Sequence, residues 1–135
     1  MKLGVFLGAM LVVVAADARA LTFSERVDAQ RSIERVYYRH QIGATLPFEQ
    51  ALPQEVLEAQ VRTYLRQSAA LEQQWRTPVT ADALRAELER IAQGTRMPER
   101  LIEIYDALGG DPFLIAECLA RPFLVDRLAR SFFAS

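Results

Sequence analysis

Apolar residues recur every three or four positions through most of the chain after residue 20, and glycine and proline fall between these stretches rather than inside them. Such spacing places apolar side chains on one face of an α-helix. No stretch shows the strict apolar-polar alternation of a half-buried β-strand. The pattern therefore predicts a single all-α domain of five or six helices over residues 21–135.

The first helix is marked by Thr22 and Glu25, which have the spacing of a capping box. This signature predicts that the helix begins directly after Thr22, and the apolar periodicity continues to about His40. Residues 43–53 contain two prolines and are expected to form a connector, because proline cannot continue a helix.

The longest predicted helix begins after Pro53 and ends at the Thr77-Pro78 step. Its inward face consists of residues three or four positions apart, among them Leu57, Val61, Tyr64, Leu65, Leu71 and Trp75. We expect the aliphatic members of this face to carry much of the stability of the domain.

The remaining helices share one type of boundary, a capping side chain or proline at the start and glycine at the end. These boundaries fall at Thr80 and Gly94, at Pro98 and Gly109-Gly110, and at Asp111-Pro112. Arg121-Pro122 is expected to kink or restart the last helix. Three phenylalanines are expected in the core: Phe113, Phe123 and Phe132.

Residues 1–20 have the pattern of a signal peptide. Lys2 precedes an unbroken apolar run over residues 3–16, and Ala18 and Ala20 supply the small residues that signal peptidase accepts. A permanent membrane anchor is the less favoured alternative, because spanning a bilayer takes about 20 apolar residues. The mature chain is therefore expected to begin at Leu21 and to reside in the periplasm or outside the cell.

Cleavage after Ala20 is expected to leave Leu21 as the amino-terminal residue of the exported protein, because the residues before the cut are small and follow an apolar run of signal-peptide length. Mass spectrometry of the protein recovered from the periplasm or the medium measures this terminus. Retention of Lys2 in that product would contradict the assignment of the leader.

Charge and cysteine content exclude some classes of function. The chain has 16 lysine or arginine and 17 aspartate or glutamate residues, so it lacks the basic excess typical of nucleic-acid binding. Cys118 is the only cysteine, which excludes an intrachain disulfide. It stands in an apolar stretch and is expected to be buried as a small hydrophobic residue.

No constellation of residues predicts catalysis, a cofactor or a metal ion. His40 is the only histidine, and its place at a helix end favours a polar surface role. Acidic pairs such as Glu87 with Glu89 are expected on outer helix faces, where solvation explains them. No glycine-rich phosphate loop is present.

Aromatic residues near helix ends are the remaining candidates for a binding site, because such residues often wall a groove for peptides. Tyr64 and Trp75 are the candidate groove residues, and Tyr37-Tyr38 have a similar position. Packing in the core is the alternative for each of them.

Residues 53–130 resemble the N-terminal helical chaperone domain of SurA-type periplasmic foldases, relatives of the parvulin prolyl isomerases. The resemblance rests on the long helix ending near Trp75, the threonine-capped helix after Thr80, the Met97-Pro98 turn and the Leu108-Gly109 step. The chain departs from that family by beginning with a helix instead of a short strand. The sheet-containing isomerase domain, with its paired histidines, is also missing.

This resemblance implies an exported, chaperone-like module that binds unfolded or extended polypeptide and has no catalytic activity of its own. Two alternatives remain open. The chain could be a structural or interaction domain at the front of a larger exported protein, or the front part of a prolyl isomerase whose catalytic domain lies downstream.

Overall fold

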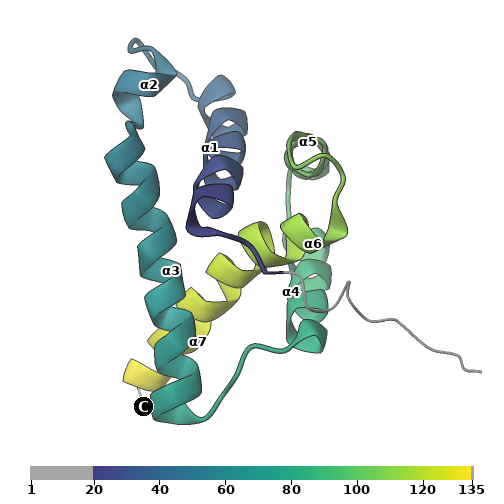
Figure 1. The fold of residues 1–135 in the computed structure, drawn as a ribbon. Helices are drawn as coiled ribbons and strands as arrows, with labels where there is room; N and C mark the ends of the chain where they lie inside the picture. Colours follow the sequence, from purple (N-terminus) through teal and green to yellow (C-terminus); the bar gives the residue numbers. More distant parts are fainter. Residues whose placement is uncertain (1–19, 135) are drawn as a thin grey trace, which may run out of the picture.

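The computed structural model describes residues 20–134, which form an all-α domain without a β-strand (Figure 1). Counting the continuous helical segment 112–134 once, the domain has six helices, as the sequence predicts. Their bounds are α1 (Phe23–Arg39), α2 (Phe48–Ala51), α3 (Gln54–Trp75), α4 (Ala81–Gly94), α5 (Pro98–Ala107), α6 (Pro112–Leu114), the π-helix η2 (Ile115–Ala120) and α7 (Arg121–Ala134).

Local capping interactions set the starts of α1 and α4. The Glu25 amide donates to Thr22 Oγ1 over 3.0 Å, and the Thr22 amide donates to Glu25 Oε1 over 2.8 Å, which completes the predicted capping box. At α4, Thr80 Oγ1 accepts a hydrogen bond from the Ala83 amide over 3.1 Å. Each of these bonds satisfies an amide that has no partner within its helix.

Left-handed backbone ends two of the helices. Gly109 and Gly110 follow α5 with φ of 71° and 65°, a conformation that glycine adopts without steric strain. Arg76 ends α3 with φ of 52°, and the next amide, from Thr77, donates to the Leu71 carbonyl. Both ends lie where the sequence predicts them.

The segment 43–53 connects α1 to α3, as predicted, and contains one helical turn that the sequence analysis did not predict. Helix α2 begins directly after Pro47, whose fixed φ suits the start of a helix. The Phe48 ring meets the Tyr38 ring edge-on with centroids 5.7 Å apart, and the Arg35 guanidinium lies 4.5 Å from the Phe48 centroid. These contacts with α1 hold the turn in place.

The last helical segment continues through Pro122 by changing its hydrogen bonding. Pro122 has no amide hydrogen, and its ring would crowd the carbonyl four residues earlier in an α-helix. Residues 115–120 form a π-helix, and the Arg121 amide donates to the Ala116 carbonyl, five residues back. The wider turn inserts one residue into the helical repeat, which rotates every later side chain by about 100°.

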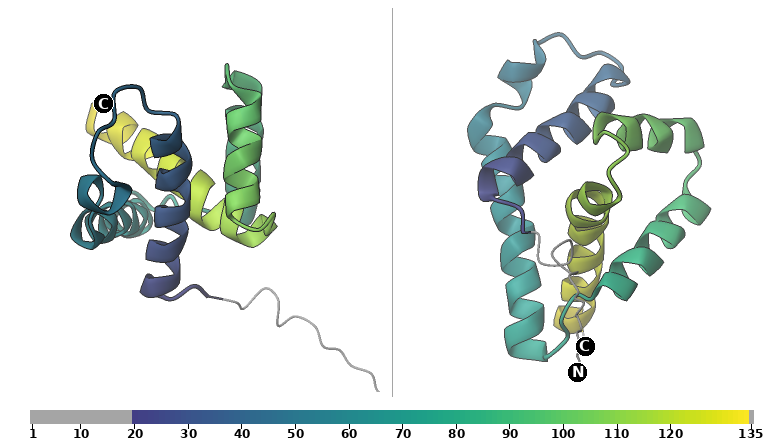
Figure 2. Two further views of the ribbon diagram at one scale, coloured as in Figure 1. Left: turned by 90° about the horizontal axis from the view of Figure 1, so that it is seen from above. Right: turned by 45° about the vertical axis from the view of Figure 1, so that its right-hand side comes forward.

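The core has two main clusters that meet at α1: in one, α1 packs against α5 and the π-helix, and in the other it packs against α3 and α7. Of the predicted inward face of α3, Leu57, Val61 and Leu71 are fully buried, whereas Leu65 is half-buried at the edge of the same cluster. Figure 2 shows α4 and α5 as an arm beside the crossing of α1 with the C-terminal helical segment. The arm, α1 and this segment together line the candidate site.

Candidate functional site

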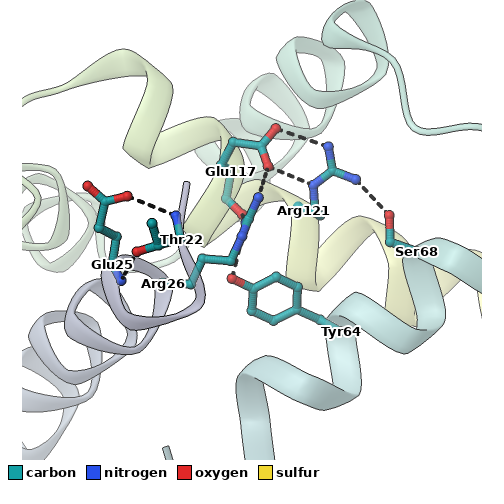
Figure 3. Close-up of polar contacts among 7 residues, drawn as sticks. All are labelled: Thr22, Glu25, Arg26, Tyr64, Ser68, Glu117 and Arg121. Carbon is teal, nitrogen blue, oxygen red and sulfur yellow. Dashed lines mark hydrogen bonds and ion pairs between the residues drawn. The ribbon is translucent and has the colours of Figure 1, made fainter. Parts of the chain in front are cut away.

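A network of arginine and glutamate side chains ties the π-helix to α1 and α3 (Figure 3). The Glu117 carboxylate accepts from Arg26 Nη2 over 2.9 Å and from Arg121 Nε and Nη2 over 2.9 and 3.0 Å. Arg121 also donates to Ser68 Oγ over 2.7 Å, and Arg26 donates to Tyr64 Oη over 3.4 Å. The network therefore fixes the position of the π-helix, from which part of the candidate site is built.

The electrostatics of this network favour the charged carboxylate. Burial alone would raise the pKa of Glu117, but hydrogen bonds from Arg121 and Arg26 outweigh that effect and hold the pKa below its usual value. The neighbouring Cys118 is 2% exposed, as the sequence predicts, and burial raises its pKa to about 11. A thiol with such a pKa is protonated at neutral pH and is a poor nucleophile.

Glu87 anchors the α4 arm, and its predicted position on a solvated outer face is wrong. Its side chain is 1% exposed and accepts hydrogen bonds from Arg90 of α4 and Arg127 of α7. Burial would raise the pKa of Glu87, but the two arginines outweigh it and hold the pKa below its usual value. The spacing from Leu84 and Ile91 places Glu87 beside the apolar face of α4, so periodicity was compatible with its burial. The sequence did not show that Arg127 of α7 would pair with it there.

The two predicted groove residues are not brought together in one groove. Tyr64 is 3% exposed and belongs to the core, and its hydroxyl accepts a hydrogen bond from Arg26. Its ring therefore cannot line a groove for peptides. Trp75 is half-buried and stacks on Phe132, with ring centroids 5.0 Å apart. Phe133 meets the same indole edge-on at 5.4 Å. The tryptophan therefore belongs to an aromatic cluster where α3 meets the end of α7.

Other residues singled out in the sequence have separate positions. His40 caps the end of α1, and its Nε2 lies 2.6 Å from Glu103 Oε1 of α5. This hydrogen bond lowers the pKa of Glu103. Ala20 is exposed, and Ala18 lies outside the described residues. Among residues 20–134, no group of three or more histidine, cysteine, aspartate or glutamate side chains is placed to hold a metal ion.

The candidate site consists of two adjoining hollows that share Tyr37 of α1, Leu119 of the π-helix and Phe123 of α7. One, of about 260 Å³, lies between α1 and α7. The other, of about 400 Å³, lies between α1 and the arm formed by α4 and α5, which we call the α4 arm. Ile91, Met97 and Leu101 of this arm are part of its lining. We call the two hollows together the Tyr37 groove.

Three of the exposed large apolar residues of the described chain line this groove. Tyr37 is 40% exposed, Met97 43% and Phe123 48%. Exposed apolar residues beside a hollow are a candidate site of interaction, and methionine is common where a surface accepts varied partners. The groove therefore has the chemistry of a site for apolar chain segments.

The prediction that Phe123 lies in the core is wrong, and the π-helix supplies the reason. A continuous α-helix would place Phe123 on the buried side with Leu119, but the extra residue in the π-turn rotates it outward. Phe113 and Phe132 are half-buried. The Arg121-Pro122 step is the signal in the sequence that could have indicated this rotation.

A larger hollow, of about 790 Å³, lies between the start of α1, α4 and α6. Its charged residues include Arg26, Glu117 and Arg121, which pair with one another, and Arg85, which pairs with Asp82. The exposed large apolar residues of the described chain do not line it. The Tyr37 groove is therefore the better candidate for a binding site.

Fold and site together define an all-α, single-domain protein with a groove lined mainly by apolar residues. Comparison with protein-family models, with curated proteins and with solved structures finds no match. No helix within residues 20–134 combines the length and the apolar character needed to cross a membrane.

Proposed function

We propose that this protein is an exported, chaperone-like module that binds unfolded or extended polypeptide in the Tyr37 groove. The observation that carries the proposal is the exposure of Tyr37, Met97 and Phe123 around two hollows that share part of their lining. The resemblance to SurA-type foldases supports the same activity. The module acts by binding alone and has no prolyl isomerase activity of its own.

The geometry of the groove suits transient binding. Its walls come from α1, the π-helix, α7 and the α4 arm, so an extended segment contacts several rigid helices at once. The site is open and mostly apolar, which favours side chains of many shapes over one defined ligand. Micromolar affinity, about 8 kcal/mol, would hold a client and still release it.

Removing the Phe123 ring is expected to weaken binding of an unfolded apolar peptide about tenfold or more, because aromatic anchors at the centre of a site carry much of the binding energy. The measurement is fluorescence anisotropy of a labelled peptide with the mature chain and with Phe123→Ala. Labelling the peptide is preferable to following Trp75, which does not line the groove. The same variant should lose the ability to slow aggregation of an unfolded client.

Phe133→Ala is the matched control, because Phe133 is 79% exposed and lies outside the groove. It should bind peptide as the parent chain does, and thermal melting should show that both variants are folded. Equal binding by the two variants would place the site elsewhere. No peptide binding and no effect on aggregation by the parent chain would favour the structural or interaction domain instead.

A further inference from the structure

The two hollows of the Tyr37 groove are lined by residues of opposite charge. The hollow beneath the α4 arm has Arg90 and Arg100 in its lining and no acidic residue. The hollow between α1 and α7 has Glu34 and Asp126 and no basic residue. Tyr37, Leu119 and Phe123 form the apolar stretch that both hollows share.

One charge at each end is not neutralised by the fold. Arg90 pairs with Glu87, and Asp126 accepts from Arg130 Nε over 2.8 Å. Arg100, in contrast, has no ion-pair partner within 4 Å among residues 20–134.

Glu34 also has no ion-pair partner within 4 Å in the described chain. Its carboxylate accepts a hydrogen bond only from the neutral Gln30 side chain, over 3.2 Å. Arg100 contributes to lowering the pKa of Glu103 but forms no ion pair with it within 4 Å. Arg100 and Glu34 are therefore the lining charges without an ion-pair partner among residues 20–134, and both can pair with a bound segment.

The Tyr37 hydroxyl lies in the fields of both charges. Partial burial raises its pKa, the Glu34 carboxylate raises it further, and the Arg100 guanidinium lowers it. Glu34 and Arg100 thus both lie within electrostatic range of the apolar residue at the centre of the groove.

We propose that the groove selects polypeptide segments in which an apolar centre is flanked by an acidic residue on one side and a basic residue on the other. The acidic residue pairs with Arg100 and the basic residue pairs with Glu34, while the apolar centre covers Tyr37, Leu119 and Phe123. This inference rests on the proposed function. It adds the class of segment that binds and the direction in which the segment runs along the groove. Complementary charge gives specificity more than affinity, which suits a site that releases its client.

The test compares three labelled peptides with the same apolar centre and with flanks that are neutral, acidic at one end and basic at the other, or acidic at both ends. Each exposed charge pair is expected to tighten binding up to about fivefold at low salt. The mixed peptide should therefore bind tightest, and the peptide with two acidic flanks should bind less tightly. The difference should shrink at high salt, where exposed charges are screened.

Variants of Arg100 and Glu34 test whether the preference for the mixed peptide arises in the groove. Arg100→Gln and Glu34→Gln should each remove part of the advantage of the mixed peptide, and Glu34→Arg should shift the preference to the peptide with two acidic flanks. Arg66→Gln and Glu72→Gln make the same charge changes at exposed positions of α3 outside the groove, and they should leave the order of affinities unchanged. A merely structural role of Glu34 would not reverse a preference.

The outcomes separate this inference from the proposed function. Equal binding of all three peptides would overturn the charge selection and leave the apolar groove standing. An unchanged preference in Glu34→Arg would also overturn it. Failure of even the neutral peptide to bind would overturn both proposals.

Discussion

Replacing Glu117 with glutamine is expected to lower the free energy of unfolding by about 3 kcal/mol, because removing one partner of a buried ion pair leaves the other charges without compensation. The Glu117 side chain is 13% exposed, and the two arginines that it binds are 13% and 15% exposed. A loss of this size is a large part of the about 5 to 15 kcal/mol that stabilises a typical domain. Urea unfolding of the mature chain at neutral pH measures it.

Asp82→Asn is the control for this variant. Asp82 also forms an ion pair with an arginine, Arg85, over 2.7 Å, but its side chain is 87% exposed. Water and salt screen such a pair, so its loss should change stability little. Equal losses in the two variants would show that the network around Glu117 does not hold the helices together.

The effect of Glu117→Gln should also depend on pH. The folded-state pKa of Glu117 is lowered from the ordinary 4.5, so the unfolded chain binds this proton more readily than the folded chain. The stabilisation is therefore fully present above pH 4.5 and is lost as the pH falls through the lower, folded-state pKa. The difference in stability between the parent chain and Glu117→Gln should shrink in acid, and a difference that stays constant would contradict the ion-pair account.

Truncating Leu71 to alanine is expected to lower the free energy of unfolding by about 2 to 5 kcal/mol, through lost burial and the cavity left behind. Leu71 is 0% exposed and packs in the cluster that joins α3 to α7. Thermal and urea unfolding with circular dichroism provide the measurement. Because the domain is small, such a loss should lower the melting temperature by many degrees.

Arg66→Ala provides the control on the same helix, since Arg66 lies on the exposed face of α3 and should barely change the stability. Leu65→Ala should fall between the two, because Leu65 is only half-buried at the edge of the cluster. A loss for Leu65→Ala as large as that for Leu71→Ala would mean that the edge of the cluster is packed as tightly as its centre.

The sequence alone determined where most of the helices begin and end. Thr22, Thr80 and Asp111 each accept a backbone hydrogen bond at the start of a helix, as their positions predict. Gly109 and Gly110 allow the left-handed turn after α5. These signals act over a few residues, because a cap or a turn is satisfied by atoms that are close in the chain.

The apolar periodicity also determined most of the core of α3, including Leu57, Val61 and Leu71. A residue at the edge of the apolar face, such as Leu65, is buried only as far as the neighbouring helix reaches. The same limit applies to Tyr37, whose place near a helix end indicated a groove wall without showing what lies opposite. Apart from residues of α1 itself, the side chains that line the groove with Tyr37 come from segments more than 50 residues away.

Tertiary structure alone decided the positions of the buried charges and the composition of the groove. Glu87 and Glu117 are buried because arginines from other helices reach them, and Arg127 and Arg26 are 40 and 91 residues away along the chain. Phe123 is exposed because the π-turn before Pro122 rotates it out of the core. Helix formation follows from hydrogen bonds between near neighbours, whereas burial and charge pairing depend on which helices meet and in what rotation, and that is settled only when the whole domain packs.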